Sequence, residues 1–340
     1  MDGGATQRHE AGIGTTHMRL TLLLVAVLAV GAAEEDTVER RVAACAALAR
    51  PEGDVAPAVV RLIAALDDPY FDVRREAVRS LGVLGAAAVP ALGKALGGGY
   101  FLRCGAASAL ASIGAPAGEA APVLVRLLGS DEMADPFLRT QVCAAISAVN
   151  APAALALPTV LAALDPGQRR PGDEHLFTWL GTLGREGAPA LPLLLGLLSD
   201  HHDQHAARRT LANLGVVALQ PLLERLRGPQ GQEDHRFIAN ALDLIAGWGA
   251  ASAPAVDDLH RRLKDGHIER RVAVVRALGC IGAPARAAVP RLVWLATHPG
   301  RAPAPASAVR SAAELRRLAA ESPVAAADGT RPAEPLLRRW

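Results

Sequence analysis

The sequence predicts an all-α protein, a right-handed superhelical α-solenoid of about eight helix pairs. The first observation is a recurring turn. A helix-like run ends in Leu-Gly-x-Leu-Gly or a close variant, a short link of Ala, Gly and Pro follows, and a proline then opens a second apolar run. These prolines lie 33, 32, 36, 34, 29, 33 and 36 residues apart, a period typical of stacked supersecondary units. They are Pro57, Pro90, Pro122, Pro158, Pro192, Pro221, Pro254 and Pro290.

Composition is the second observation. Hydrophobic residues make up 51% of the chain but aromatic residues only 3%, so the apolar content is mostly Ala, Leu and Val. Ala and Leu are among the best helix formers, and no alternating segment bounded by hairpin turns indicates a strand. The formal net charge of +2 argues against a dedicated nucleic-acid binder, which usually carries a strong basic excess.

The second unit shows the predicted element order most clearly. Asp68 is a candidate N-cap, with Pro69 at the first helical position. The run 70–84 then keeps one face apolar on a helical period, Gly85 stops the helix, and Pro90 opens the second helix. Neither helix buries its apolar face alone, so each unit must stack on its neighbours.

Three first helices carry the same pattern, in which a recurring arginine follows a Val or Leu, or Arg270 in the last unit, and a Leu or Ile precedes the closing glycine: residues 72–85, 102–114 and 271–282. The pattern resembles the HEAT repeat, in particular the short HEAT-like repeats first associated with phycobilisome lyases, within the armadillo-type helical solenoids. The resemblance covers roughly residues 35–297. It is specific for fold and not for function, because the family includes scaffolds, chaperone-like proteins and a few enzymes.

The recurring arginine is the part of the pattern that varies most. In this family it usually makes a structural contact between units, and that role is expected of Arg74, Arg103, Arg139 and Arg271. In the middle units the same place holds Asp173, Gln204 and Ile238, which indicates that the motif has drifted there.

The two ends of the chain differ from the repeats. Leu20–Val30 is an 11-residue apolar run between Arg19 and the small residues 31–33, the arrangement of a secretory signal peptide; an uncleaved anchor or a first buried helix is the alternative. We therefore expect an N-terminal extension over 1–33, starting at Met1 or at Met18, a repeat solenoid over 34–297, and a Pro/Ala-rich tail over 298–340 with one capping helix. This organisation predicts an extracytoplasmic protein, periplasmic or secreted, with no stable membrane span after cleavage.

The sequence contains little that indicates a catalytic function. In the branch that resembles deoxyhypusine hydroxylase, His-Glu pairs hold two irons where this chain has Arg75-Glu76, and His9-Glu10 is the sole such dipeptide here. Arginine cannot replace an imidazole ligand, so we expect no catalytic residue and no cofactor. An enzyme or enzyme accessory of the bilin-lyase or metal-hydroxylase type remains the alternative function.

Two sets of residues are of types that bind metals or undergo redox chemistry. His201, His202 and His205 are weak metal candidates, because His201 and His205 would share a face at i, i+4 if they lay on one helix; a solvated loop and first helical turn is the alternative. The four cysteines form no C-x-x-C pair, and we expect them to fill core positions as small hydrophobic residues. They are Cys45, Cys104, Cys143 and Cys280.

A partner surface is predicted on the second helices, which line the concave face of such solenoids. Positions two and five residues after each proline are apolar and should face the core, and the position four residues after it should point away. That last row reads Arg61, Lys94, Arg126, Ala162, Gly196, Arg225, Asp258 and Trp294.

The charged members of the row are the candidate partner-binding residues: Arg61, Lys94, Arg126, Arg225 and Asp258. A basic beginning followed by an uncharged middle suits an extended acidic or amphipathic protein segment; basic side chains that only solubilise Ala-rich helices are the alternative. The long loop 165–173 is either a contact-bearing insert or a tolerated surface insertion. We therefore predict a monomeric, non-catalytic protein-interaction scaffold with an unidentified protein partner, and a purely structural spacer is a further alternative.

Overall fold

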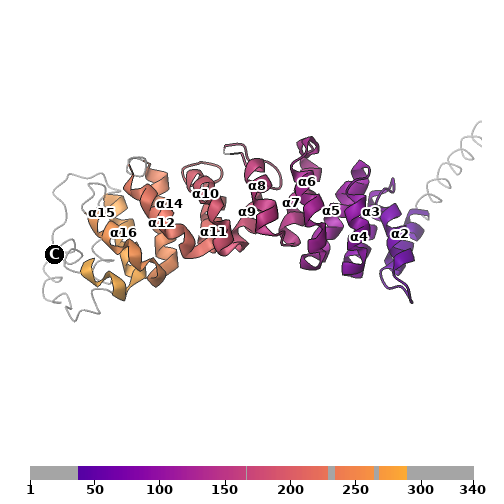
Figure 1. Ribbon diagram of the computed structural model, residues 1–340, viewed down its shortest axis with the longest axis horizontal. Helices are drawn as coiled ribbons and strands as arrows, with labels where there is room; N and C mark the ends of the chain where they lie inside the picture. Colours follow the sequence, from indigo (N-terminus) through magenta and orange to yellow (C-terminus); the bar gives the residue numbers. More distant parts are fainter. Residues whose placement is uncertain (1–36, 166, 229–233, 264–267, 289–340) are drawn as a thin grey trace, which may run out of the picture. The chain divides into compact units, whose positions relative to one another are not determined.

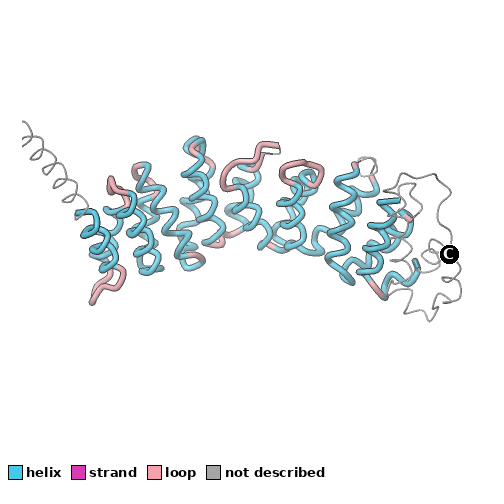
Figure 2. The backbone as a smooth tube through the Cα atoms, turned by 180° about the vertical axis from the view of Figure 1, so that it is seen from behind, coloured by secondary structure: helices cyan, strands magenta, loops and turns pink. Residues whose placement is uncertain are grey.

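The computed structural model describes residues 37–165, 167–228, 234–263 and 268–288, and these fall into two compact units, residues up to Leu124 and residues from Val125. Every described element is an α-helix or a short 3-10 helix (Figures 1 and 2), which confirms the all-α prediction. The predicted signal segment, the tail over 298–340, Pro290 and Trp294 lie outside the described residues.

The first unit stacks helix pairs. Its first helices pack on one another, α3 against α5, and each second helix packs against the first helix of the next pair, α2 against α3 and α4 against α5, so no single pair buries its apolar face alone. After a helix over residues 37–48, its elements are α2 (Ala56–Ala65), α3 (Phe71–Leu84), η1 (Gly85–Ala88), α4 (Val89–Ala95), α5 (Tyr100–Ile113), η2 (Ala115–Ala120) and the first residues of α6 (Ala121–Leu128).

The second unit repeats the arrangement. Its first helices form stacked neighbours, α7 with α9, α9 with α11, α11 with α14, and α14 with α16. After the end of α6, the elements are η3 (Asp131–Ala134), α7 (Pro136–Ala148), α8 (Ala153–Ala163), α9 (Asp173–Thr182), η4 (Gly184–Ala190), α10 (Leu191–Leu197), α11 (Gln204–Leu214), η5 (Gly215–Ala218), α12 (Leu219–Arg227), α14 (His235–Trp248), η6 (Gly249–Ala255), α15 (Val256–Arg262), α16 (Ile268–Ile281) and η7 (Ala283–Ala288).

The recurring turn has one backbone solution. In most described units a glycine with positive φ directly follows the first helix, and a 3-10 helix leads from it to the second. Gly215 is typical: its φ of 74° and ψ of −152° stop α11, and its N–H still donates to the carbonyl of Leu211. Such dihedral angles are almost exclusive to glycine. After α7 the positive φ belongs to Asn150, a residue that tolerates it better than most.

The prolines mark the second helices as predicted in several units and not in all. Pro90 lies in the first turn of α4, where its missing N–H costs nothing, and Pro192 does the same in α10. Pro158 instead lies inside α8, which begins at Ala153, and Pro254 lies in the preceding 3-10 helix. In these two units the prediction that the proline opens the helix was wrong.

The core lies where the periodicity placed it. Leu92 and Ala95 of α4 and Leu194 and Leu197 of α10, two and five residues after their prolines, are all buried. Cys45, Cys104 and Cys143 are buried free thiols as predicted, but Cys280 is exposed. None of the helices within the described ranges is both long and apolar enough to cross a membrane.

The predicted N-cap of the second unit was wrong. α3 begins at Phe71, after Tyr70, and Asp68 lies in the loop before it, only 6% exposed. The Asp68 carboxylate accepts a hydrogen bond from the Tyr70 N–H at 2.9 Å and pairs with Arg41. Arg74 donates to the main-chain oxygens of Asp68 and Pro69, at 2.7 and 2.9 Å. The expected structural role of Arg74 is therefore to hold this loop.

Candidate functional site

Within each unit, the row of positions predicted to point away from the core is largely exposed. In the first unit Arg61 on α2 and Lys94 on α4 are exposed. In the second unit Arg126 on α6, Ala162 on α8 and Gly196 on α10 are exposed too. The face of these second helices was therefore predicted correctly.

Arg225 and Asp258 depart from that row. Arg225 is half-buried, with its guanidinium carbon 4.6 Å from the centre of the Phe237 ring. Asp258 is only 5% exposed; Arg227 donates to both its carboxylate oxygens, at 2.9 and 2.6 Å, and Arg261 donates to one. The prediction that Asp258 points to solvent was wrong, because these two arginines cover it. The hydrogen bond from Arg227 holds the pKa of Asp258 below its usual value despite burial.

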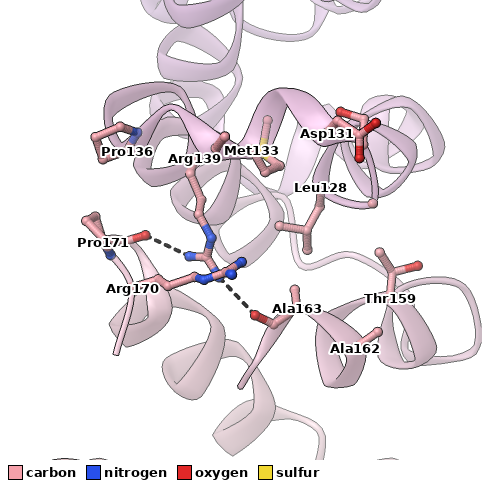
Figure 3. A pocket seen from close by; sticks show the side chains of 13 residues that line it. Leu128, Asp131, Met133, Pro136, Arg139, Thr159, Ala162, Ala163, Arg170 and Pro171 are labelled. Atoms are coloured by element: carbon pink, nitrogen blue, oxygen red, sulfur yellow. Dashed lines mark hydrogen bonds between the residues drawn. The ribbon is translucent and has the colours of Figure 1, made fainter. Parts of the chain in front are cut away.

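A groove of about 510 Å³ opens in the second unit between the end of α6, η3 and the start of α7 on one side and the end of α8 on the other. Its lining is apolar over much of its length: Leu128 and Met133 face Ala162 and Ala163 across it (Figure 3). Ala162 is the member of the predicted row that the groove contains. The inserted loop supplies one end through Arg170 and Pro171.

A buried ion pair fixes this end of the groove. Arg139 of α7 and Asp173 at the start of α9 lie 2.7 Å apart with side chains 2% and 4% exposed. Arg139 also donates to the carbonyl oxygens of Pro171 at 2.7 Å and Ala163 at 3.1 Å (Figure 3), and Asp173 accepts from the Arg170 N–H at 2.7 Å. Residues 170–173 of the insert therefore form a wall of the groove, because their backbone is hydrogen-bonded to a buried charge pair.

The same pair explains the apparent drift of the repeat motif. Arg139 makes the structural contact between successive repeats that was expected of it. Asp173 occupies the arginine position of the next unit, and its carboxylate neutralises the arginine of the preceding one. The sequence signal for this pairing is an acid at the position of the recurring arginine in the next repeat. In the sequence this acid, Asp173, indicated only that the motif had drifted.

Close packing also holds the loop. Gly172 has a φ of +92°, and a Cβ there would come within 3.0 Å of the Thr140 Cα and 3.1 Å of the Cys143 Cβ. Only glycine allows the loop to pass so near α7. Cys143 lies beneath, with its Sγ 3.8 Å from Arg139 Nη1, and burial raises the pKa of its thiol to about 12. Cys143 is thus an inert packing residue at neutral pH.

The charge that the groove presents comes from its rim. Arg139 is compensated by Asp173, whereas Arg170 is exposed and its guanidinium makes no ion pair within the described part of the chain. Asp131 lies on the opposite side (Figure 3). The groove therefore offers a ligand three kinds of group: small apolar side chains, one uncompensated cation and the Thr159 side chain. The insert stands out in the sequence by its length, whereas no sequence pattern assigns a role to Arg170.

The histidine cluster has a different local structure from the one that would favour a metal. α11 begins at Gln204, so His201 and His202 lie in a turn and His201 does not share a helix face with His205. Asp200 holds the turn, accepting from the N–H groups of His202 and Asp203 at 2.7 and 3.0 Å, and these bonds lower its pKa. Among the described residues no group of three His, Cys, Asp or Glu side chains is arranged to hold a metal ion.

Comparison with known proteins finds a family match over part of the chain and similarity to solved structures. The family of HEAT repeats matches residues 59–132. A chain in a solved structure concerned with a phosphorylation switch that controls the interaction between cadherin and beta-catenin is similar at 17% identity, with 88% of this chain and 87% of that chain covered and a TM-score of 0.40. No curated protein matches the sequence significantly.

The matched residues 59–132 contain the turn and the helix pairs that recur through both units. Stacked helix pairs with a positive-φ residue between their two helices continue beyond the matched region through α15, and a 3-10 helix precedes each second helix there except α8. Over residues 59–132 the chain is therefore similar to the family of HEAT repeats.

Proposed function

We propose that this protein is a non-catalytic, exported scaffold that binds a segment of another protein on the surface of its second helices. The observation that carries the proposal is the groove of the second unit, with its apolar lining, its fixed inserted wall and the uncompensated Arg170. Repeat arrays of this kind commonly use such a surface for binding.

The shape and chemistry of the groove favour a polypeptide as the ligand. Its lining combines apolar and polar side chains from two successive helix pairs, with Leu128 on one side and Ala162 on the other, and a polypeptide segment carries both kinds of complementary group. Apolar side chains of an extended or helical segment would be buried against Met133 and Ala163. A carboxylate on that segment would pair with Arg170 at the rim. An amphipathic segment with at least one acidic residue meets all three conditions.

The first unit offers a second, independent basis for the proposal. Arg61 and Lys94 are exposed on α2 and α4, two helices that pack on each other. Neither makes an ion pair within the described residues. Together they form a basic surface that would attract an acidic partner, and Arg126 on α6 adds a third cation in the second unit.

Export is the part of the proposal that rests on sequence alone. Leu20–Val30 has the length, flanking charge and following small residues of a signal peptide. Fractionation of the native cells, followed by N-terminal sequencing, tests it. We expect the chain in the cell envelope fraction or the medium, beginning near Glu34. A cytoplasmic chain that begins at Met1 or Met18 would contradict export.

The binding proposal is tested by pull-down with matched variants. Bait protein carrying Arg170→Glu or Ala162→Arg should lose a partner that the native chain retains, because one change reverses the rim charge and the other fills the groove. Arg169→Glu in the same loop and Ala154→Arg on the same helix are exposed outside the groove and should retain it. Equal capture by all four variants would overturn the groove as the binding site.

The same samples test the alternative function. A charge-reversed Arg61, Lys94 and Arg126 variant should weaken capture of an acidic partner. Metal analysis and an absorption spectrum of the purified native chain should show neither stoichiometric metal nor pigment. Iron, zinc or a bilin near one per chain would contradict the non-catalytic scaffold and favour the enzyme or accessory role.

A further inference from the structure

A second surface of the first unit gathers aromatic residues in a chain that has few. The chain has two tyrosines and five phenylalanines. Both tyrosines and two of the phenylalanines lie at the starts of α3 and α5, and we call Tyr70, Phe71, Tyr100 and Phe101 the aromatic edge. Phe71, Tyr100 and Phe101 are 61, 41 and 44% exposed. Exposed aromatic rings are costly in water, and aromatic residues are enriched where proteins bind one another.

The aromatic edge is held in place by arginines. The Arg74 guanidinium carbon lies 4.2 Å from the Phe101 ring centre and 5.8 Å from that of Phe71, so it bridges the starts of both helices. Arg74 is itself fixed by its hydrogen bonds to the loop before α3. Tyr100 and Phe101 contact each other edge to face, with ring centres 5.4 Å apart. The surface is thus preorganised, which reduces the entropy lost on binding.

The charge around the aromatic edge is positive. Arginines outnumber acids in and beside it by four to three: Arg41, Arg74, Arg75 and Arg103 against Asp67, Asp68 and Asp72. Asp68 is buried and already paired with Arg41, so it does little to attract or repel a partner. Arg75 is the most exposed of the cations near Phe71, with a side chain 69% exposed and a single weakly held pairing, to Asp72 at 3.0 Å. An acidic ligand complements this surface.

The spacing of the rings indicates the conformation of the ligand. α3 packs directly against α5, and the Arg74 guanidinium carbon lies 5.8 Å from the Phe71 ring centre and 4.2 Å from that of Phe101, so these two rings, one at the start of each helix, lie within about 10 Å of each other. A polyproline II helix has three residues per turn and a rise of about 3.1 Å per residue, so its turn of about 9 Å matches that separation. Prolines three residues apart can therefore contact a ring at the start of α3 and a ring at the start of α5 in succession, as in aromatic-lined grooves that recognise such segments.

We propose that the aromatic edge binds an acidic, proline-rich segment of another protein in the polyproline II conformation. Prolines would lie on the rings of Phe71 and Tyr100, and carboxylates between them would pair with Arg75 and its neighbours. This surface belongs to the starts of the first helices of the first unit, so the inference stands independently of the groove in the second unit.

Fluorescence anisotropy of a labelled Glu-Pro-Pro repeat peptide, titrated with the full chain, tests the inference. We expect saturable binding that weakens with added salt, because exposed charge pairs are screened. The double variant Phe71→Ser/Tyr100→Ser should lower the affinity about tenfold or more, the size of effect seen for buried aromatic anchors. Phe137→Ser, a comparably exposed phenylalanine (53%) at the start of α7, should leave the affinity unchanged.

Two further peptides separate the parts of the inference. A Glu-Ala-Ala repeat keeps the charge without the prolines, and a Lys-Pro-Pro repeat keeps the prolines with the opposite charge; both should bind at least about tenfold more weakly than Glu-Pro-Pro. Equal binding of either peptide, absence of binding by Glu-Pro-Pro, or an unaffected double serine variant would overturn the inference. If circular dichroism shows that the serine variant is unfolded, Phe71→Leu/Tyr100→Leu retains apolar bulk without the flat rings and must show the same loss.

Discussion

The α3–α5 and α7–α9 junctions join successive repeats by opposite means. At the first, Gly82 of α3 faces Ser112 of α5 so closely that a Cβ on the glycine would lie 3.1 Å from that of the serine. At the second, Arg139 and Asp173 form a buried ion pair. The small-residue junction brings two helices close and leaves no space between them. The charged junction holds a nine-residue insert, 165–173, and the groove forms beside that insert.

The comparison shows how one repeat unit supports two kinds of surface. At the α3–α5 junction, where the helices pack through small residues, the exposed aromatic edge lies at the starts of the two helices. Where a charge pair fixes a loop, the loop becomes part of a binding wall. Buried charges are rarely retained for stability alone, so the pair at the α7–α9 junction is consistent with a role in shaping the groove.

The largest effect is expected from breaking the charged junction. Asp173→Ala leaves Arg139 buried without its counterion and should lower the free energy of unfolding by about 3–5 kcal/mol. Urea unfolding followed by the fluorescence of the buried Trp179 on α9 measures it. The double variant Arg139→Met/Asp173→Leu should recover most of that loss. A loss below about 1 kcal/mol for the single variant would show that the pair is not buried in solution.

The recurring glycine turn between the helices of a pair should show the next largest effect. Gly215→Ala places a Cβ on a residue with φ of 74° where nothing lies within 4 Å, so its cost is backbone strain of about 2 kcal/mol. Gly247→Ala also enters open space, but within α14 and without positive φ. Alanine should stabilise that site by about 0.5–1 kcal/mol. Equal effects of the two substitutions in thermal unfolding would contradict the assigned turn.

The small-residue junction should respond more mildly. Gly82→Ala forces Ser112 to move by a few tenths of an ångström, and we expect a loss of about 1 kcal/mol from overpacking. Gly93→Ala on α4, where the added carbon meets nothing within 4 Å, is the control and should be neutral or stabilising. Chemical denaturation of both variants gives the comparison, and a stabilised Gly82→Ala would mean that α3 and α5 are not in close contact.

The partly exposed pair at Asp258 should show the smallest effect and a pH signature. Because hydrogen bonding from Arg227 lowers its pKa in the folded state, Asp258 stabilises the fold above its unfolded pKa of about 3.9. That contribution is lost as the pH falls through the folded-state value. Asp258→Asn should therefore cost about 1 kcal/mol at neutral pH, because Arg227 and Arg261 are half-exposed or more, and nothing in strong acid.

Asp203 offers the opposite sign as a control. Burial raises its pKa, so its ionised form destabilises the fold once the pH rises above the unfolded value. Asp203→Asn should accordingly stabilise the protein at neutral pH and lose that advantage on acidification. Parallel pH profiles for Asp258→Asn and Asp203→Asn would contradict both assignments.

Periodicity predicted the fold because burial of one helix face leaves a regular mark in sequence. It identified Leu92 and Leu194 as core and Arg61 as exposed, and all three are so. It failed for Asp258, whose burial depends on Arg227, 31 residues earlier in the chain. A repeat position predicts which way a residue points, whereas its exposure also depends on long side chains from the neighbouring unit.

The groove was less predictable for the same reason. The insert was visible by its length, but its conformation depends on Arg139, 34 residues before Asp173. The start of α3 was also shifted by a local hydrogen bond that competes with capping, at Asp68. These interactions are specific to individual side chains and leave no periodic signal.

Photo-crosslinking from position 162 tests the central claim most directly. A benzophenone amino acid replaces Ala162 in the groove, and in a matched chain it replaces Ala154, which is exposed on the same helix outside the groove. The account predicts that irradiation in the native cells links the first chain, and not the second, to one discrete protein, and that Arg170→Glu abolishes the link. Identical crosslinks from both positions, or none from position 162, would contradict it.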